Sequence, residues 1–198
     1  VSQLDERTKR EIEAALRPAL KVAERVYSEL FNQGGALERQ LSDANESLAL
    51  AEAALQRVKE GRAPLSPDVQ RLLTELRDHG LHPVPVCDLV RITDSTWQPV
   101  IEAYLNRNIE ALLVSADEEK EAFRIYRGLT GQRAVYGAKI AMESRQLTGK
   151  SVESGSVAEL IEGDHPAAVA YLRRQFGDLR RATTDAEALA GQRTLTQD

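Results

Sequence analysis

The chain has 198 residues, 42% of them hydrophobic, and a formal net charge of −5, which is enough for one ordinary domain plus an extended element. A net charge of this sign gives no general reason to expect nucleic acid or an anionic membrane as a partner. The single cysteine, Cys87, excludes an internal disulfide and favours a reducing, cytoplasmic compartment. No run of about 18 apolar residues is present, so we expect no membrane span.

The sequence up to Arg62 has the composition of a helix, because Ala, Leu, Glu, Arg and Gln dominate and no strand-like alternation occurs. Apolar residues recur every three or four positions, as in the a and d seam of a coiled coil. This seam comprises Leu37, Leu41, Ala44, Leu48, Ala51, Leu55 and Val58, and continues backwards through Gly34, Leu30, Tyr27, Ala23 and Leu20. A seam this narrow predicts a partner helix. The alternative is an amphipathic helix that lies on the neighbouring domain.

Two features interrupt this helical pattern. Pro18 lacks a backbone N–H and predicts a kink. Gly34 and Gly35 weaken the helix, and predict either a bend in a continuous arm or a turn between two helices that fold back on each other. The glycine and prolines of the segment 61–67 predict a domain boundary. We therefore expect a coiled-coil arm over residues 1–62 and a globular domain over residues 64–198.

The globular part alternates between helix and strand patterns. Ser66 and Pro67 predict the start of a helix that ends near Asp78. Three strands and two intervening helices follow, which is a βαβαβ arrangement of the α/β (α+β) class. The strands are expected over 86–92, 109–114 and 134–140, and the helices over 94–106 and 117–128. Further helices are expected over 157–162, from the capping residue Asp164 to Gly177, and from Thr184, with a closing strand over 194–196.

The stretch Leu147–Ser151 reads LTGKS, which is how a nucleotide-binding P-loop ends. The first glycine of that motif would fall on Ser144, and the residues after Ser151 form a polar loop instead of a helix. The apolar and then acidic segment 111–118 resembles a magnesium-holding strand, but it precedes LTGKS and so reverses the usual order. We interpret LTGKS as a surface loop.

No constellation for catalysis or metal binding is apparent. His79 and His82 flank a glycine turn without a Cys or acid at zinc-ligand spacing, and Cys87 occupies an expected strand. Ser156 lacks the G-x-S-x-G context of a nucleophile. We therefore expect no catalytic residue, no metal and no cofactor, and hence no enzyme. Two pairs of basic residues remain, Arg173 with Arg174 and Arg180 with Arg181. They indicate either a patch that binds phosphate groups or the solvated ends of a helix.

Two blocks resemble a known family. The first is CDLVRITDSTWQPVIEAYLN, Cys87–Asn106, with the apolar segment 111–114 after it, and the second joins Gly155–Glu162 to His165–Leu172. They are similar to the hinge region of condensin-like SMC proteins of the MukB, MksB and JetC (Wadjet) group. The departures are His165, where the family has Asn, and Val169, where it has Arg. With the ending Arg193–Thr196, the resemblance spans residues 65–198.

The resemblance implies a homodimerisation module at the tip of a long antiparallel coiled coil whose ATPase head lies outside this chain. The parent protein would be cytoplasmic and nucleoid-associated, and would capture and move DNA in loop extrusion, chromosome organisation or anti-plasmid defence. Its kleisin and accessory subunits would bind elsewhere in the parent.

We expect the dimer to form at an edge strand over 134–140, through Tyr136, Gly137 and Lys139, where a glycine allows close backbone approach. A second contact is expected at Gly155 and Ser156. The four arginines of the two basic pairs are the candidate contacts for DNA. The alternatives are a small α/β ligand-binding or enzymatic domain with a helical appendage, and a coiled-coil adaptor with a globular tip.

Overall fold

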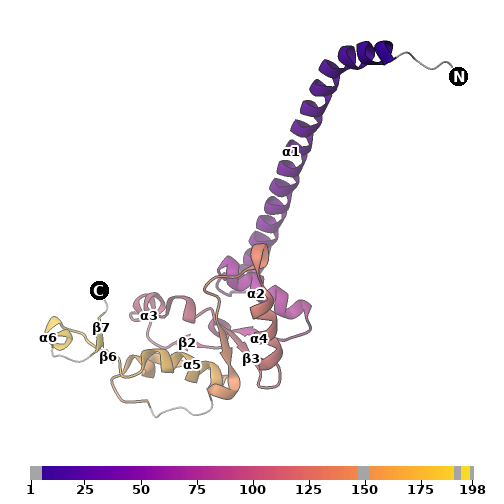
Figure 1. Cartoon of the computed structure of the whole chain (residues 1–198). Coiled ribbons are helices and arrows are strands. Elements are labelled where there is room, and N and C mark those ends of the chain that lie inside the picture. Colours follow the sequence, from indigo (N-terminus) through magenta and orange to yellow (C-terminus); the bar gives the residue numbers. More distant parts are fainter. Residues whose placement is uncertain (1–5, 147–151, 190–192, 197–198) are drawn as a thin grey trace. The chain divides into compact units, whose positions relative to one another are not determined.

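The computed structural model of the chain describes residues 6–146, 152–189 and 193–196 (Figure 1). The chain divides into two compact units, Val1–Ala51 and Glu52–Asp198. No helix within the described ranges is long and apolar enough to cross a membrane.

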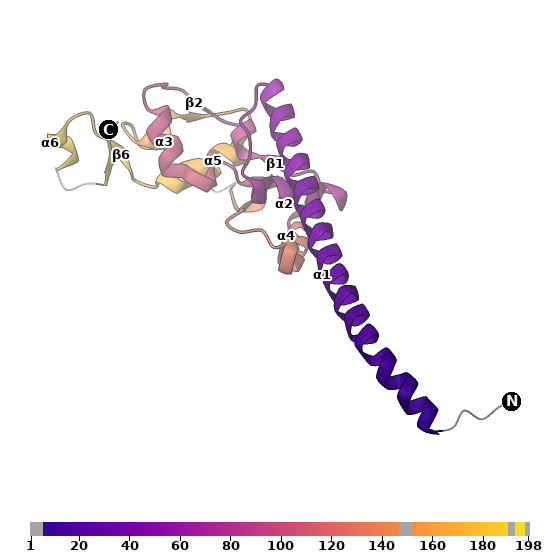
Figure 2. The same cartoon turned by 90° about the horizontal axis from the view of Figure 1, so that it is seen from above.

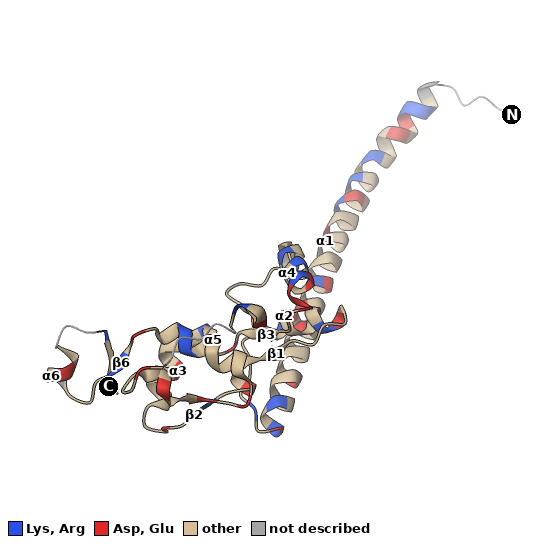
Figure 3. Cartoon of the chain, turned by 90° about the horizontal axis from the view of Figure 1, so that it is seen from below, with Lys and Arg blue, Asp and Glu red and all other residues tan. Residues whose placement is uncertain are grey.

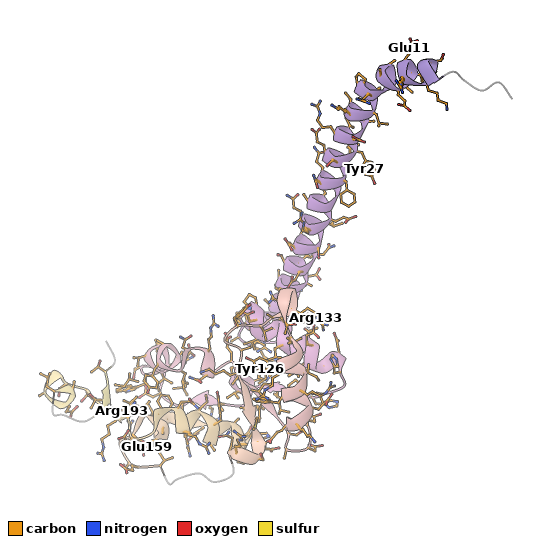
Figure 4. The ribbon with its side chains drawn as sticks, in the orientation of Figure 1. Glu11, Tyr27, Tyr126, Arg133, Glu159 and Arg193 are labelled. Carbon is orange, nitrogen blue, oxygen red and sulfur yellow. The ribbon has the colours of Figure 1, made fainter. Side chains whose placement is uncertain are left out.

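The first unit consists of most of helix α1, Glu6–Lys59, which continues without interruption through Gly34 and Gly35. The helix changes direction between Glu11 and Tyr27 (Figure 4), as Pro18 in this stretch predicts, because proline removes one hydrogen bond of the helical ladder. The two glycines are tolerated because each costs only about 1 kcal/mol relative to alanine and strong helix formers surround them.

The apolar seam of α1 is open to solvent. No side chain in residues 8–51 is buried, and Leu30, Leu37 and Leu41 are 62%, 64% and 64% exposed. A helix with such a seam leaves apolar surface in water unless a second helix covers it. An apolar seam of this kind is typical of one strand of a coiled coil.

The second unit holds the remaining elements. The helices are α2 Pro67–Asp78, α3 Gln98–Leu105, α4 Glu119–Gly128, α5 Pro166–Phe176 and α6 Asp185–Ala188. The strands are β1 Val84–Pro85, β2 Arg91–Ile92, β3 Leu112–Val114, β4 Ile140–Met142, β5 Ile161–Glu162, β6 Arg180–Arg181 and β7 Thr194–Leu195. Short 3₁₀ turns occupy Val86–Asp88, Asn106–Asn108, Gly131–Arg133, Glu143–Arg145 and Val157–Leu160.

The second unit contains a three-stranded sheet of order β1-β3-β4. Strand β1 runs antiparallel to β3, with Val84 opposite Leu113, whereas β4 runs parallel to β3, with Ala141 opposite Leu113. Helix α4 connects β3 to β4, so these three elements form one βαβ unit. Two further pairs complete the strands: β2 is antiparallel to β5, and β6 is parallel to β7.

Strand β3 separates two hydrophobic cores. In Figure 1 and Figure 2, α3 and α5 lie together in one part of the second unit and α2 and α4 in the other. Leu112 and Val114 belong to the first core, together with buried side chains of α2 and α4, and Leu113 belongs to the second core with α3 and α5. This division follows from the strand geometry, because successive side chains point to opposite faces. All three residues of β3 are apolar because both faces of the strand are covered.

The start of α2 at Pro67 after Ser66 and the closing strand β7 agree with the sequence predictions. Three other predictions were wrong in detail. The expected strand 86–92 is broken by a 3₁₀ turn, Val86–Asp88, that follows Pro85. The expected strand 134–140 reaches the sheet only at Ile140, because Gly137 has φ +74° and turns the chain before it. The expected helix 157–162 is a 3₁₀ turn followed by β5.

Two smaller corrections concern α5 and the residues after it. The residue that precedes the first turn of α5 is His165 and not Asp164. Arg180 and Arg181, treated as helix-end residues in the sequence, form β6. A strand of two residues leaves too short a pattern for recognition by alternation.

Candidate dimerisation surface and helix anchor

Strand β4 forms one edge of the three-stranded sheet, and the segment before it is held by the turn Asn106–Asn108. The Nη1 of Arg107 donates a hydrogen bond to the carbonyl of Tyr136 at 2.6 Å, and the Nζ of Lys139 donates to Oδ1 of Asn108 at 2.7 Å. The Tyr136 side chain itself is 71% exposed. The segment before β4 thus presents an exposed aromatic side chain, while these two hydrogen bonds of Arg107 and Lys139 end on uncharged oxygens.

Gly137 has a structural role inside the chain. Its φ is +74°, and a Cβ at this position would lie 1.7 Å from Nη1 and 2.8 Å from Cζ of Arg107. The absence of a side chain makes room for that guanidinium. The glycine is thus explained by the approach of Arg107, whereas the sequence suggested the approach of a partner backbone.

The second expected contact, Gly155 and Ser156, directly precedes Val157 of the second core. Gly155 is at the surface with φ +80°; its N–H donates to Oε2 of Glu159 at 3.1 Å and its carbonyl accepts from the N–H of Arg181 at 3.1 Å. Ser156 is only 3% exposed and forms a β-bridge with Arg180. Direct contact with a partner at this place would therefore involve Gly155 and not the side chain of Ser156.

Ser156 lines an open groove of about 1060 Å³ beside α5. Apolar side chains such as Val152, Ala158 and Val169 share its lining with both arginines and carboxylates. Because positively and negatively charged side chains both line the groove, its charge does not indicate a class of ligand.

The four arginines proposed for DNA all form hydrogen bonds or ion pairs within the chain. Figure 3 shows that basic and acidic residues both occur along the elements near α5 and β6. Arg180 and Arg181 form ion pairs with Glu153 at 3.2 Å and Glu159 at 2.6 Å. Arg173 donates to the carbonyl of Ile161 at 3.2 and 2.7 Å, and Arg174 donates to the carbonyl of Arg145 at 2.6 Å. The positive charges of Arg180 and Arg181 are balanced by carboxylates. Arg173 and Arg174 bond to neutral carbonyl groups, which do not balance their charges.

The other residues considered for chemistry have structural surroundings. Across the described ranges, no group of three or more His, Cys, Asp or Glu side chains could hold a metal ion. The side-chain hydrogen bond from His82, with Nδ1 2.9 Å from Oε1 of Glu118, lowers the pKa of that carboxyl. Burial raises the pKa of the Cys87 thiol to about 12, which disfavours the thiolate that a nucleophile requires. The segment LTGKS lies outside the described residues.

A buried ion pair that the sequence did not predict fastens the end of α1. Arg57 is 7% exposed. Its Nη1 and Nη2 donate to the two carboxylate oxygens of Asp88 at 3.0 and 2.7 Å, and its Nε donates to the carbonyl of Ala63 at 2.8 Å. The Sγ of Cys87 lies 3.9 Å from the same Nη2. The only local signal was a basic residue between two seam positions, Leu55 and Val58.

Known structures identify the architecture. No family model and no curated protein matches the sequence. Among solved structures, the SMC hinge domain of Geobacillus stearothermophilus, crystallised as an asymmetric dimer, aligns with TM-score 0.52 and 20% identity over 93% of this chain and 77% of that chain. The Pyrococcus furiosus Smc hinge domain with an extended coiled coil aligns with TM-score 0.48 and 18% identity, covering 94% of this chain and 68% of that one.

The Smc5/6 hinge domain of S. pombe also matches, with TM-score 0.44 and 18% identity over 92% of this chain and 75% of that chain. The Geobacillus alignment shows that this chain has the mixed α/β fold of an SMC hinge domain with a long N-terminal helix. The predicted fold class is thereby confirmed.

Proposed function

We propose that the chain is the homodimerisation hinge of an SMC-like protein and that α1 is one strand of its coiled-coil arm. The similarity to the Geobacillus hinge, a dimer in its crystal, over 93% of this chain is the observation that carries the proposal. The exposed seam of α1 supports it independently, since such a seam requires a second helix. The division into an arm over 1–62 and a hinge over 64–198 belongs to the same proposal.

The proposed dimer surface is the outer edge of β4 together with Tyr136 and Lys139. An edge strand carries backbone groups available for pairing, and a two-fold dimer uses the same surface of both copies. Tyr136 is a suitable anchor because an exposed tyrosine offers a large apolar ring at low cost in conformational entropy. Gly155 would supply a second contact, whereas Gly137 and Ser156 would act by shaping the backbone on each side.

Sedimentation equilibrium from low to high micromolar concentration tests this proposal. The intact chain should be a dimer, and Tyr136→Ser should raise its dissociation constant at least about tenfold. Tyr27→Ser is a matched control, because Tyr27 is 72% exposed but lies in α1. A chain that is monomeric throughout contradicts the proposal. A loss of association only in Tyr27→Ser would assign it to the helix and support a coiled-coil adaptor.

The sequence blocks at Cys87–Asn106 and Gly155–Glu162 support a finer assignment to the MksB, MukB and JetC group, in which the parent protein moves DNA with kleisin and accessory subunits. DNA contact by the hinge itself would depend on Arg173 and Arg174, the two arginines without a carboxylate partner among the described residues. Fluorescence anisotropy with a duplex at several salt concentrations tests it. Arg174→Glu should weaken binding and make its salt dependence less steep, and an unchanged slope contradicts DNA contact at this residue.

A further inference from the structure

The guanidinium of Arg57 joins three separate segments of the second unit. It contacts Asp88 after strand β1 and the carbonyl of Ala63 in the linker, while its own backbone belongs to the last turn of α1. The side chains of Arg57 and Asp88 are only 9% and 10% exposed. The pair is therefore shielded from the screening that makes surface ion pairs weak.

We propose that the Arg57–Asp88 pair is a lock that fastens the end of α1, residues 52–59, to the globular unit, and that this end detaches as one step when the pair opens. The proposal concerns the junction alone and does not require that the chain dimerise. If the chain is a hinge, the lock is the point through which a rotation of the arm helix reaches strand β1.

The geometry favours two discrete states over a gradual loosening. The planar guanidinium donates two parallel hydrogen bonds to one carboxylate, an arrangement that a lysine cannot reproduce. Losing the partner would leave a charge buried and unpaired, which is strongly unfavourable. The helix end is therefore expected to be either fully fastened or detached far enough for Arg57 to reach water.

Asp88 has a second cation within reach, which makes the open state accessible. Nη1 of Arg62 lies 3.6 Å from Oδ2 of Asp88, and the Arg62 side chain is 45% exposed. When Arg57 leaves, Arg62 can move closer and keep the carboxylate paired. The carboxylate would then exchange one arginine for another, so that only Arg57 has to be hydrated.

Cys87 is a built-in reporter of this lock, because it is the only cysteine of the chain and lies beside the pair. We would measure its alkylation by iodoacetamide in the intact chain, in Arg57→Met and in Arg57→Lys. Arg57→Met should raise the rate at least about tenfold, the change that a fall of about 1.4 kcal/mol in local opening free energy produces. Arg57→Lys keeps the positive charge but cannot donate two parallel hydrogen bonds to Asp88. Its alkylation rate should lie between those of the intact chain and Arg57→Met.

Electrostatics alone would have the opposite effect on this rate. The positive charge of Arg57 lowers the pKa of the Cys87 thiol, so removing it disfavours the reactive thiolate. A faster reaction in Arg57→Met therefore reports exposure of the thiol. Arg25→Met is the matched control: its partner Glu29 lies in the same helix, and the two side chains are 73% and 63% exposed. This variant should leave the rate unchanged.

Hydrogen exchange locates the opening. In Arg57→Met the amides of residues 52–59 should lose protection while those of α5 keep theirs. If protection is lost in α5 as well, the domain of Arg57→Met has unfolded. The proposal is then tested on Arg57→Lys, by the alkylation rate of Cys87 and the exchange protection of residues 52–59. Alkylation that is unchanged or slower, with full protection of residues 52–59, overturns the lock. Sedimentation of the same variants separates this result from the proposed function, because an open lock should leave a dimer through β4 intact.

Discussion

At the scale of single residues, the side chains that organise the junction were invisible to local sequence patterns. Arg57 and Asp88 are separated by 31 positions, and each has an ordinary local explanation as a helix-end basic residue and a loop carboxylate. Their pairing depends on the linker and on the 3₁₀ turn after β1, which fix where the two chain segments meet. By contrast, the start of α2 was predictable, because Ser66 and Pro67 act through the local backbone.

The Cys87 thiol should make the domain less stable at alkaline pH. Its pKa is raised from 9.0 to about 12 in the folded chain, first of all by burial. The stability that this group contributes is therefore complete below its unfolded pKa and is lost as the pH rises from 9 towards 12. The free energy of unfolding, measured by urea titration, should fall across this range.

The variant Cys87→Ser shows how much of this loss of stability comes from the thiol, because a serine hydroxyl does not ionise between pH 9 and 12. This variant should show a shallower loss of stability above pH 9. Some loss should remain, because burial also raises the pKa of the Tyr171 hydroxyl to about 12. Identical pH dependence in the two proteins would mean that the thiol does not contribute.

At the scale of elements, hydrophobic pattern predicted the helices better than the strands. Helix α4 begins within two residues of its expected start and ends at Gly128 as expected, because its periodic apolar face extends over several turns. No strand described in the chain is longer than three residues, so alternation had too few positions to separate a strand from a 3₁₀ turn. The interface residues were expected on a strand that proves to be mostly an irregular segment before β4.

The pairing of β2 with β5 depends on the glycine that follows β5. A Cβ on Gly163 would lie 2.2 Å from the carbonyl oxygen of Leu89 and 3.0 Å from Cα of Val90, both of them backbone atoms that cannot rotate away. Gly163→Ala should therefore separate the two segments and lower the free energy of unfolding by about 1–3 kcal/mol. Thermal and urea unfolding measure this loss.

Gly128→Ala is the control for this effect. Gly128 is the last residue of α4, and a Cβ there would meet no atom within 4 Å. Alanine should leave stability unchanged or raise it by about 0.4–1 kcal/mol, because it restricts the unfolded chain. Equal losses in both variants would show that the close contact at Gly163 is not the cause.

At the scale of the whole molecule, composition and the two sequence blocks predicted an α/β domain with a long helical segment, and the structure has this architecture. The sequence could not show which contacts the end of the helix makes. Residues 52–59 lie in the compact unit that begins at Glu52, and the Arg57–Asp88 ion pair lies within this unit. A truncation at the linker would therefore cut through an interaction of the domain.

Two truncations separate the contributions of helix and domain to self-association. A chain that begins at Glu52 keeps the Arg57 pair, so it should unfold at the same temperature as the second unit of the full chain and remain a dimer in sedimentation equilibrium. A chain that begins at Ala63 leaves Asp88 buried without Arg57 or Arg62, and should lose about 3–5 kcal/mol of stability. If the chain from Glu52 is folded but monomeric, self-association resides in the exposed seam of α1, and the globular unit is the tip of a coiled-coil adaptor.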